Sequence, residues 1–109
     1  MDDLTRRRAA WEAQSELFLD TEPDLAVIAC QLRATGYSVP ELDAMLRGEV
    51  APVLGGNLLS VAGVWSGFDL TSVEARYRAG RRSPTLLSRV TCRMIRDDWA
   101  RVLERLQEA

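Results

Sequence analysis

The residues best suited to chemistry in this chain are its arginines and carboxylates, and the two types are segregated. The chain has no histidine and no lysine, so all 14 basic residues are arginine. The span 76–96 holds seven arginines and no carboxylate, whereas the span 9–32 holds five carboxylates and no basic residue. Guanidinium groups bind carboxylates and phosphates through paired hydrogen bonds. These residue types therefore suggest recognition of a charged partner.

The missing residue types argue against most familiar catalytic devices. Histidine is the most common general acid or base and the usual activator of a nucleophile, and a Schiff base requires lysine. A zinc site needs clustered cysteine and histidine ligands. The chain has only Cys30 and Cys92, which lie far apart and are expected to be small buried thiols. We expect a protein that is not an enzyme and that uses no cofactor and no metal.

Two short motifs resemble ligand sites but have simpler explanations. Asp20, Glu22 and Asp24 form a conceivable carboxylate set for magnesium or calcium. They lie, however, at a junction between two predicted helices, where acidic residues cap a helix and complement its dipole. Gly55-Gly56-Asn57 lacks the lysine and the hydroxyl of a phosphate-binding loop. That motif is typical of a helix terminator followed by a turn.

Helical patterns dominate the first half of the chain. Apolar residues at helical spacing predict a helix over about 4–19. A second helix is predicted to start with Thr21 as its cap and to stop at Gly36. Ser38 and the glutamate three residues later predict a third start. Because Pro52 cannot donate to the carbonyl of Gly48, that helix should end near residue 47 and be followed by a bent or separate turn to residue 54.

The second half begins with a long connection and continues with two predicted helices. Residues 55–67 contain four of the seven glycines, yet they are too apolar for a solvated linker. A fourth helix is predicted from Asp69 or Thr71 to about residue 79. A last helix is predicted from Ser83-Pro84 to about residue 107, as one continuous element. Its core-facing stripe is predicted to comprise Leu87, Val90, Met94, Ile95, Trp99, Val102 and Leu106.

These patterns predict an all-α fold: a single compact domain over 1–109 with about five helices and one long apolar, glycine-rich connection. A chain of 109 residues that is 47% hydrophobic and 28% charged is large enough to build its own core. No apolar run approaches the roughly 20 residues needed to cross a bilayer. The N-terminal stretch becomes polar too soon for a signal peptide. We expect a cytoplasmic location and no membrane partner.

The arginine-rich span allows a nucleic-acid-binding hypothesis. On one continuous helix, Arg89, Arg93 and Arg96 lie at i, i+4 and i+7 and share a face. The residues that this hypothesis assigns to phosphate binding are Arg76, Arg81, Arg82, Arg89, Arg93 and Arg96. The chain as a whole is acidic, with an isoelectric point near 5.1, and it lacks a recognition-helix pattern. Solvated arginines, or arginines paired within the fold, remain an alternative.

The acidic span favours a protein partner, which we prefer. The expected contacts are Glu16, Asp20, Glu22 and Asp24, with Trp65 or Phe68 as an aromatic anchor. The hypothesis is a non-enzymatic protein-binding module, such as an immunity protein that neutralises a bacterial toxin. Two alternatives stay open: the acidic residues form a solvated helix face, and the aromatic residues are plugs that close the core. A symmetric homodimer through the terminal helix is also open.

Several motifs resemble a family of small bacterial proteins of unknown function. They are the run from Ser15 to Glu22 (SELFLDTE), EVAPVL at 49–54, Asn57-Leu58, and AGVWSGFD at 62–69. The resemblance covers about residues 5–80 and leaves the last predicted helix outside. It implies a standalone helical domain and brings no assigned activity with it. Because several of its residues are of core type, the resemblance informs the fold more than a site.

Overall fold

The computed structural model describes residues 3–18, 22–54, 70–81 and 83–107, and every regular element in these ranges is helical. The helices are α1 (Asp3–Ser15), α2 (Leu25–Thr35), α3 (Val39–Met45), α4 (Ala51–Leu54), α5 (Thr71–Arg78), α6 (Leu86–Met94) and α7 (Arg96–Gln107). A 3-10 turn, Glu16–Phe18, follows α1, and a π-helical segment, Leu46–Val50, joins α3 to α4. The predicted all-α class is confirmed. In the described ranges, no helix is long and apolar enough to cross a membrane.

The caps of α2 and α3 show how closely local sequence determines the helix ends. Ser38 and Glu41 form the predicted capping box, and Gly36 ends α2 with a φ of 77°. The predicted cap of α2 at Thr21 is wrong, although Thr21 itself lies outside the described residues. Asp24 caps this helix instead, because its side chain accepts a hydrogen bond from the backbone N–H of Val27 at 3.2 Å.

Pro52 shapes the connection between α3 and α4. The chain stays helical there but widens into the π-helical segment, in which the N–H of Ala51 donates to the carbonyl of Leu46. Since Pro52 has no N–H, the Gly48 carbonyl lacks its usual helical donor. It accepts instead from Nε of Arg76 on α5, at 3.4 Å. The α-helix predicted to end near residue 47 ends at Met45, and the separate turn predicted up to residue 54 is found as α4, after the π-helical segment. The Gly48 carbonyl connects α5 to this part of the fold.

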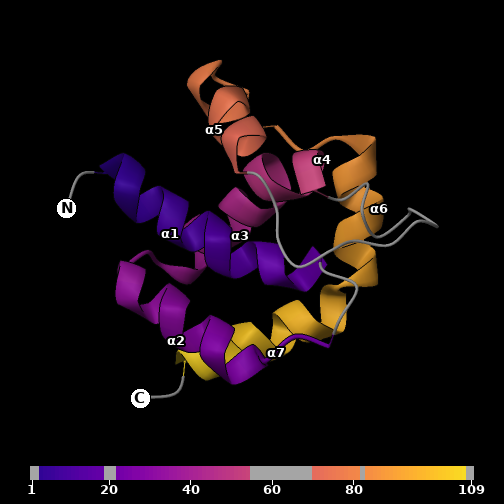
Figure 1. Ribbon diagram of the computed structural model, residues 1–109. Coiled ribbons are helices and arrows are strands. Elements are labelled where there is room, and N and C mark those ends of the chain that lie inside the picture. The colour runs from indigo at the N-terminus through magenta and orange to yellow at the C-terminus, as the bar shows by residue number, and fades with distance from the viewer. Residues whose placement is uncertain (1–2, 19–21, 55–69, 82, 108–109) are drawn as a thin grey trace.

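The last predicted helix is two helices, so the prediction of one continuous element is wrong. α6 starts at a capping box formed by Thr85 and Ser88, and it ends at Ile95, whose φ and ψ are −101° and 11°. α7 then begins with Asp97 and Asp98 in its first turn, where negative charge is favourable. The two helices pack on different neighbours: α6 on α4 and the π-helical segment, and α7 on α2 (Figure 1).

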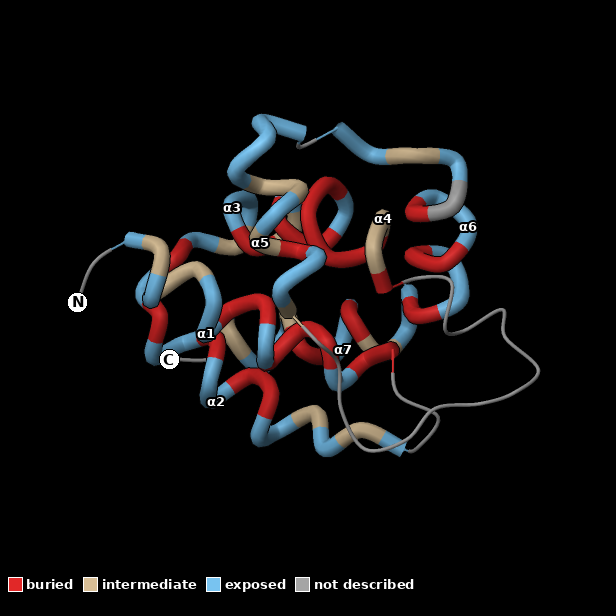
Figure 2. Tube along the Cα trace, turned by 45° about the horizontal axis from the view of Figure 1, so that its top comes forward, coloured by how far each residue is buried: buried red, intermediate tan, exposed pale blue. Residues whose placement is uncertain are grey.

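The core lies where α1, α2, α7 and the α3–α4 region meet (Figures 1 and 2). Its largest fully buried side chains include those of Trp11, Phe18, Leu32, Leu42 and Val50. Ile95, at the break before α7, is buried, as are Trp99 and Val102 on α7, and Leu106 is half-buried, as predicted. The prediction that Val90 and Met94 extend this stripe is wrong, because both are exposed. The break at Ile95 explains the error, since α6 does not continue the register of α7.

Candidate partner-binding surfaces and a buried carboxylate

The feature that most resembles a reaction centre is the carboxylate of Glu49, which the π-helical segment carries into the core. Glu49 is 4% exposed. Nη1 of Arg7 donates to both of its oxygens at 2.9 Å, and Nε1 of Trp11 donates to Oε1 at 2.9 Å. Both donors come from α1. They satisfy a charge that would be costly to bury alone.

Aromatic rings hold the Arg7 guanidinium in place. Its Cζ lies 4.6 Å from the ring centroid of Tyr77 and 5.7 Å from that of Tyr37. The ring of Tyr77 also meets Trp11 edge-on, with centroids 5.6 Å apart. Burial acts to lower the pKa of Arg7, but the hydrogen bond and charge of Glu49 outweigh it, so the pKa lies above its ordinary value. The cluster is a fixed ion pair that joins α1, α5 and the π-helical segment.

A pocket beside this cluster is lined by residues that already make bonds within the fold. It is open, has a volume of about 220 Å³ and is lined by Arg7, Glu41, Ala44, Met45 and Glu49. Glu41 is engaged in the α3 capping box, where its Oε1 accepts hydrogen bonds from Ser38, and these bonds lower the pKa of the carboxyl. Across the described ranges, no group of three or more cysteine, aspartate or glutamate side chains is arranged to hold a metal ion.

A second polar cluster fixes α7 against α3. Nε1 of Trp99 donates to Oδ1 of Asp43 at 2.9 Å, and Nε of Arg47 donates to Oδ2 at 2.9 Å. The hydrogen bond to Asp43 raises the pKa of Arg47. Cys92 is buried nearby, and burial raises the pKa of its thiol, so it is a poor nucleophile. The other thiol, Cys30, is exposed, contrary to the prediction. Because Asp43 uses both of its oxygens to bind side chains of the fold, the second cluster is structural, like the first.

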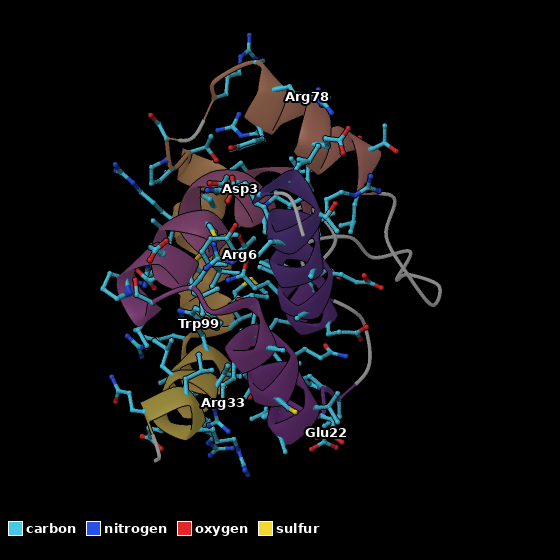
Figure 3. All side chains as sticks on the ribbon, turned by 90° about the vertical axis from the view of Figure 1, so that its left-hand side faces the viewer. Asp3, Arg6, Glu22, Arg33, Arg78 and Trp99 are labelled. Atoms are coloured by element: carbon cyan, nitrogen blue, oxygen red, sulfur yellow. The ribbon has the colours of Figure 1, made fainter. Side chains whose placement is uncertain are left out.

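The carboxylates of the acidic span are exposed wherever the structure describes them. Glu12 and Glu16 lie at the end of α1 and in the 3-10 turn, while Glu22 and Asp24 precede α2. Figure 3 shows Glu22 just before the start of α2 and Arg33 near its other end, so these two charges are separated by the length of the helix. Asp24 is also the cap of α2. Three of the predicted contact residues, Asp20, Trp65 and Phe68, lie outside the described residues.

The arginine-rich span does not form the single face that the sequence predicted. Arg76 is partly buried and donates to the backbone carbonyls of Gly48 and Ser83, which makes it a structural residue. Arg89 and Arg93 are exposed on α6. Arg96 is exposed on α7, beyond the break at Ile95, so the i+7 relation does not hold. Arg81 is exposed, and Arg82 lies outside the described residues.

Among the described residues, the ion pairs leave the carboxylates of the span 9–32 and the arginines from 81 to 96 unneutralised, whereas Arg78 is paired. The pairs join Arg7 to Glu49 and Asp3, Arg8 and Arg78 to Glu74, and Arg47 to Asp43. In these ranges no ion pair includes a carboxylate of the span 9–32 or any arginine from 81 to 96. The predicted segregation of charge in the sequence is therefore retained as separate surfaces in the fold.

The sequence analysis missed a surface on α6 where apolar side chains point outward. Leu86, Val90 and Met94 are 79%, 43% and 54% exposed. Among the described side chains on the other side of the helix, those of Ser88, Thr91, Cys92 and Ile95 are buried. The side chain of Leu87, which was predicted to face the core, lies outside the described residues. The Thr85–Ser88 capping box was the available signal, because it places a helix start at Leu86 and thereby sets the register.

Taken together, these features define an all-α domain with a buried Arg–Glu pair and several unpaired charged surfaces. The chain belongs to the family DUF7079, a domain of unknown function, whose model matches residues 5–108. The match includes α6 and α7, so it extends beyond the 5–80 range expected from the resemblance. No curated protein and no solved structure matches the chain significantly.

Replacing Glu49 tests the importance of the buried pair. Glu49→Ala is expected to lower the free energy of unfolding by about 3 kcal/mol, because it leaves the Arg7 charge buried without a partner. The double variant Arg7→Met, Glu49→Leu is expected to lose only about 1 kcal/mol, since one unsatisfied N–H, that of Trp11, then remains. Urea unfolding followed by tryptophan fluorescence measures both. If the double variant is less stable than the single variant, the loss in Glu49→Ala does not come from leaving the Arg7 charge unpaired.

The exposed side chains of α6 give a second stability test. Val90→Ser with Met94→Gln is expected to change the free energy of unfolding by no more than about 0.5 kcal/mol, because both side chains face solvent. Cys92→Ser, on the buried side of the same helix, serves as the sensitive control. Thermal unfolding distinguishes the two, and a loss of more than about 2 kcal/mol in the double variant would show that this face is packed.

Proposed function

We propose that this chain is a non-enzymatic, protein-binding module that acts in the bacterial cytoplasm. The observation that carries the proposal is the exposed and unpaired acidic span of Glu12, Glu16, Glu22 and Asp24. A cluster of like charges that the fold leaves unneutralised attracts an oppositely charged partner and accelerates association with it. The partner expected for this surface is a basic protein.

The narrower form of the proposal is an inhibitor, such as an immunity protein that neutralises a bacterial toxin. Many toxins that act on nucleic acids carry basic surfaces, which an acidic surface can cover. The chain supports this form through its small size and its lack of histidine and lysine, which removes the commonest catalytic groups. The two polar clusters described above also have structural roles, so neither supplies an evident reaction centre.

Affinity capture with charge-reversed variants tests the acidic surface. The wild-type chain is expected to retain a stoichiometric protein from native lysate, and Glu16→Arg with Glu22→Arg is expected to abolish retention, because attraction becomes repulsion. Glu104→Arg, an exposed position on α7, is the matched control and should retain the partner. Failure of the wild-type chain to retain any partner, or equal retention by the two variants, would refute the proposal for this surface.

Nucleic-acid binding is the alternative function, and one observation supports it. Arg81, Arg89, Arg93 and Arg96 are exposed and have no ion-pair partner among the described residues. The apolar side chains exposed beside the arginines of α6 count against it, since a phosphate-binding surface is polar. Arg76 also counts against it, because this arginine binds backbone carbonyls of the fold and is less available for phosphates.

A direct binding titration decides this alternative. If it is correct, the chain binds duplex DNA or structured RNA at low salt. Its affinity falls steeply as salt rises, because releasing condensed counterions into a more concentrated salt solution gains less entropy. Arg89→Glu, Arg93→Glu and Arg96→Glu together should then abolish binding, while Glu16→Arg with Glu22→Arg should not. Fluorescence anisotropy with labelled oligonucleotides is the measurement. No binding at low salt eliminates the alternative.

A further inference from the structure

The outer face of α6 combines an apolar line with a row of arginines. At about 100° per residue, Leu86, Val90 and Met94 fall within about 80° of arc around the helix axis. Arg89 and Arg93 follow on one side of that line, within about another 60°. All five side chains are exposed, and no carboxylate occurs between residues 76 and 96. The face is therefore apolar along its middle and basic along one edge.

The interior of the domain does not need these apolar side chains. The buried side of α6 packs on α4 and the π-helical segment through Ser88, Thr91 and Cys92, which are all small. Figure 2 shows the buried positions of α6 turned toward α4 and its exposed positions turned away from the molecule. Three of the larger apolar side chains of this helix, those of Leu86, Val90 and Met94, thus point outward, the reverse of an ordinary surface helix. Such an arrangement is typical of a surface that a partner covers.

We propose that the face formed by Leu86, Arg89, Val90, Arg93 and Met94 docks an acidic amphipathic helix of a partner protein. The apolar side chains of the partner, spaced three or four residues apart, pack on the apolar line of α6. Its aspartate or glutamate side chains, along one edge, pair with Arg89 and Arg93. This surface differs from the acidic span in location and in the charge of its partner, so either surface can fail its test without the other.

Charge and geometry favour this occupant over the others. A second copy that paired α6 with α6 would juxtapose Arg89 and Arg93 with two further arginines or with apolar side chains. A basic helix on an anionic membrane presents cations along its whole polar face, whereas here both arginines lie on one edge and the opposite side packs on the domain. A nucleic acid offers phosphates to the arginines but nothing to Leu86, Val90 or Met94.

Selection from a library of displayed amphipathic helices, with all face positions randomised, tests the proposal on the full-length chain. The enriched sequences are expected to share apolar residues at helical spacing with acidic residues along one edge. A synthetic peptide of the consensus sequence should then bind with an affinity that Val90→Ser plus Met94→Gln lowers by at least about tenfold. Arg89→Glu plus Arg93→Glu should lower it by a similar factor, and raising the salt concentration should weaken wild-type binding.

Matched controls separate this surface from general stickiness. Val27→Ser removes an exposed apolar side chain on α2, and Arg101→Glu reverses an exposed charge on α7. Both should bind the consensus peptide as the wild type does. Thermal unfolding of every variant checks that each one folds. The Val90, Met94 double variant is expected to fold, because both side chains are exposed.

Several outcomes would overturn the proposal. They are a selection that enriches no sequence dependent on α6, a consensus without acidic residues, equal loss of affinity in the α2 and α7 controls, and transfer of the α6 dependence to another occupant. The last is measured with vesicles of phosphatidylserine and phosphatidylcholine, with duplex DNA, and by sedimentation of the chain alone. Retained peptide binding in both α6 variants would likewise place the contact elsewhere.

Discussion

The position of Glu49 is the constraint on which the rest of the fold depends. A carboxylate this deeply buried is tolerated only if donors surround it, because desolvating an ion costs several kcal/mol. Arg7 and Trp11, one helical turn apart on α1, supply those donors. The aromatic ring of Tyr77 brings α5 to the same point. Three segments that are distant in sequence are therefore required to meet in one orientation.

The π-helical segment explains how this carboxylate reaches its partners. A π-helical turn inserts one extra residue and rotates the following residues relative to an α-helix. Pro52 favours this distortion, since it cannot complete the bond to Gly48 that an α-helix would make. The carbonyl that is released then accepts from Arg76. One missing N–H thus has two consequences: it shapes the segment that carries Glu49, and it provides an anchor for an arginine of α5.

Sequence predicts this fold where the determinants are local. The capping box at Ser38, the terminator at Gly36 and the end of the α-helix before Pro52 each involve residues within a few positions of one another, and all three are confirmed. The Arg7–Glu49 pair was not predictable in this way, because its partners are 42 residues apart. The break at Ile95 was missed because apolar residues continue at helical spacing through it. That error also placed Val90 and Met94 in the core, and it hid the α6 face.

The arginines of this chain fall into two groups that composition alone does not distinguish. Arg7 and Arg76 are partly buried and act within the fold, through a carboxylate and through backbone carbonyls. Arg89 and Arg93 remain in solvent. The guanidinium group suits both roles, since it stays charged when partly buried and its donors form a planar fork. Because Arg7 and Arg76 are bonded within the fold, the arginines that remain available to a partner form a smaller surface than the composition suggests.

The attachment of α5 has a consequence for how the molecule opens. Among its own residues Val73 alone is fully buried, and the helix projects from the rest of the domain at the top of Figure 1. Apart from that contact, the ring of Tyr77 and polar bonds from Arg76 and Glu74 hold it. Polar bonds near solvent exchange readily with water, whereas buried apolar area resists opening. We therefore expect the amide hydrogens of α5 to exchange by local detachment more readily than those of α1, which lies in the core.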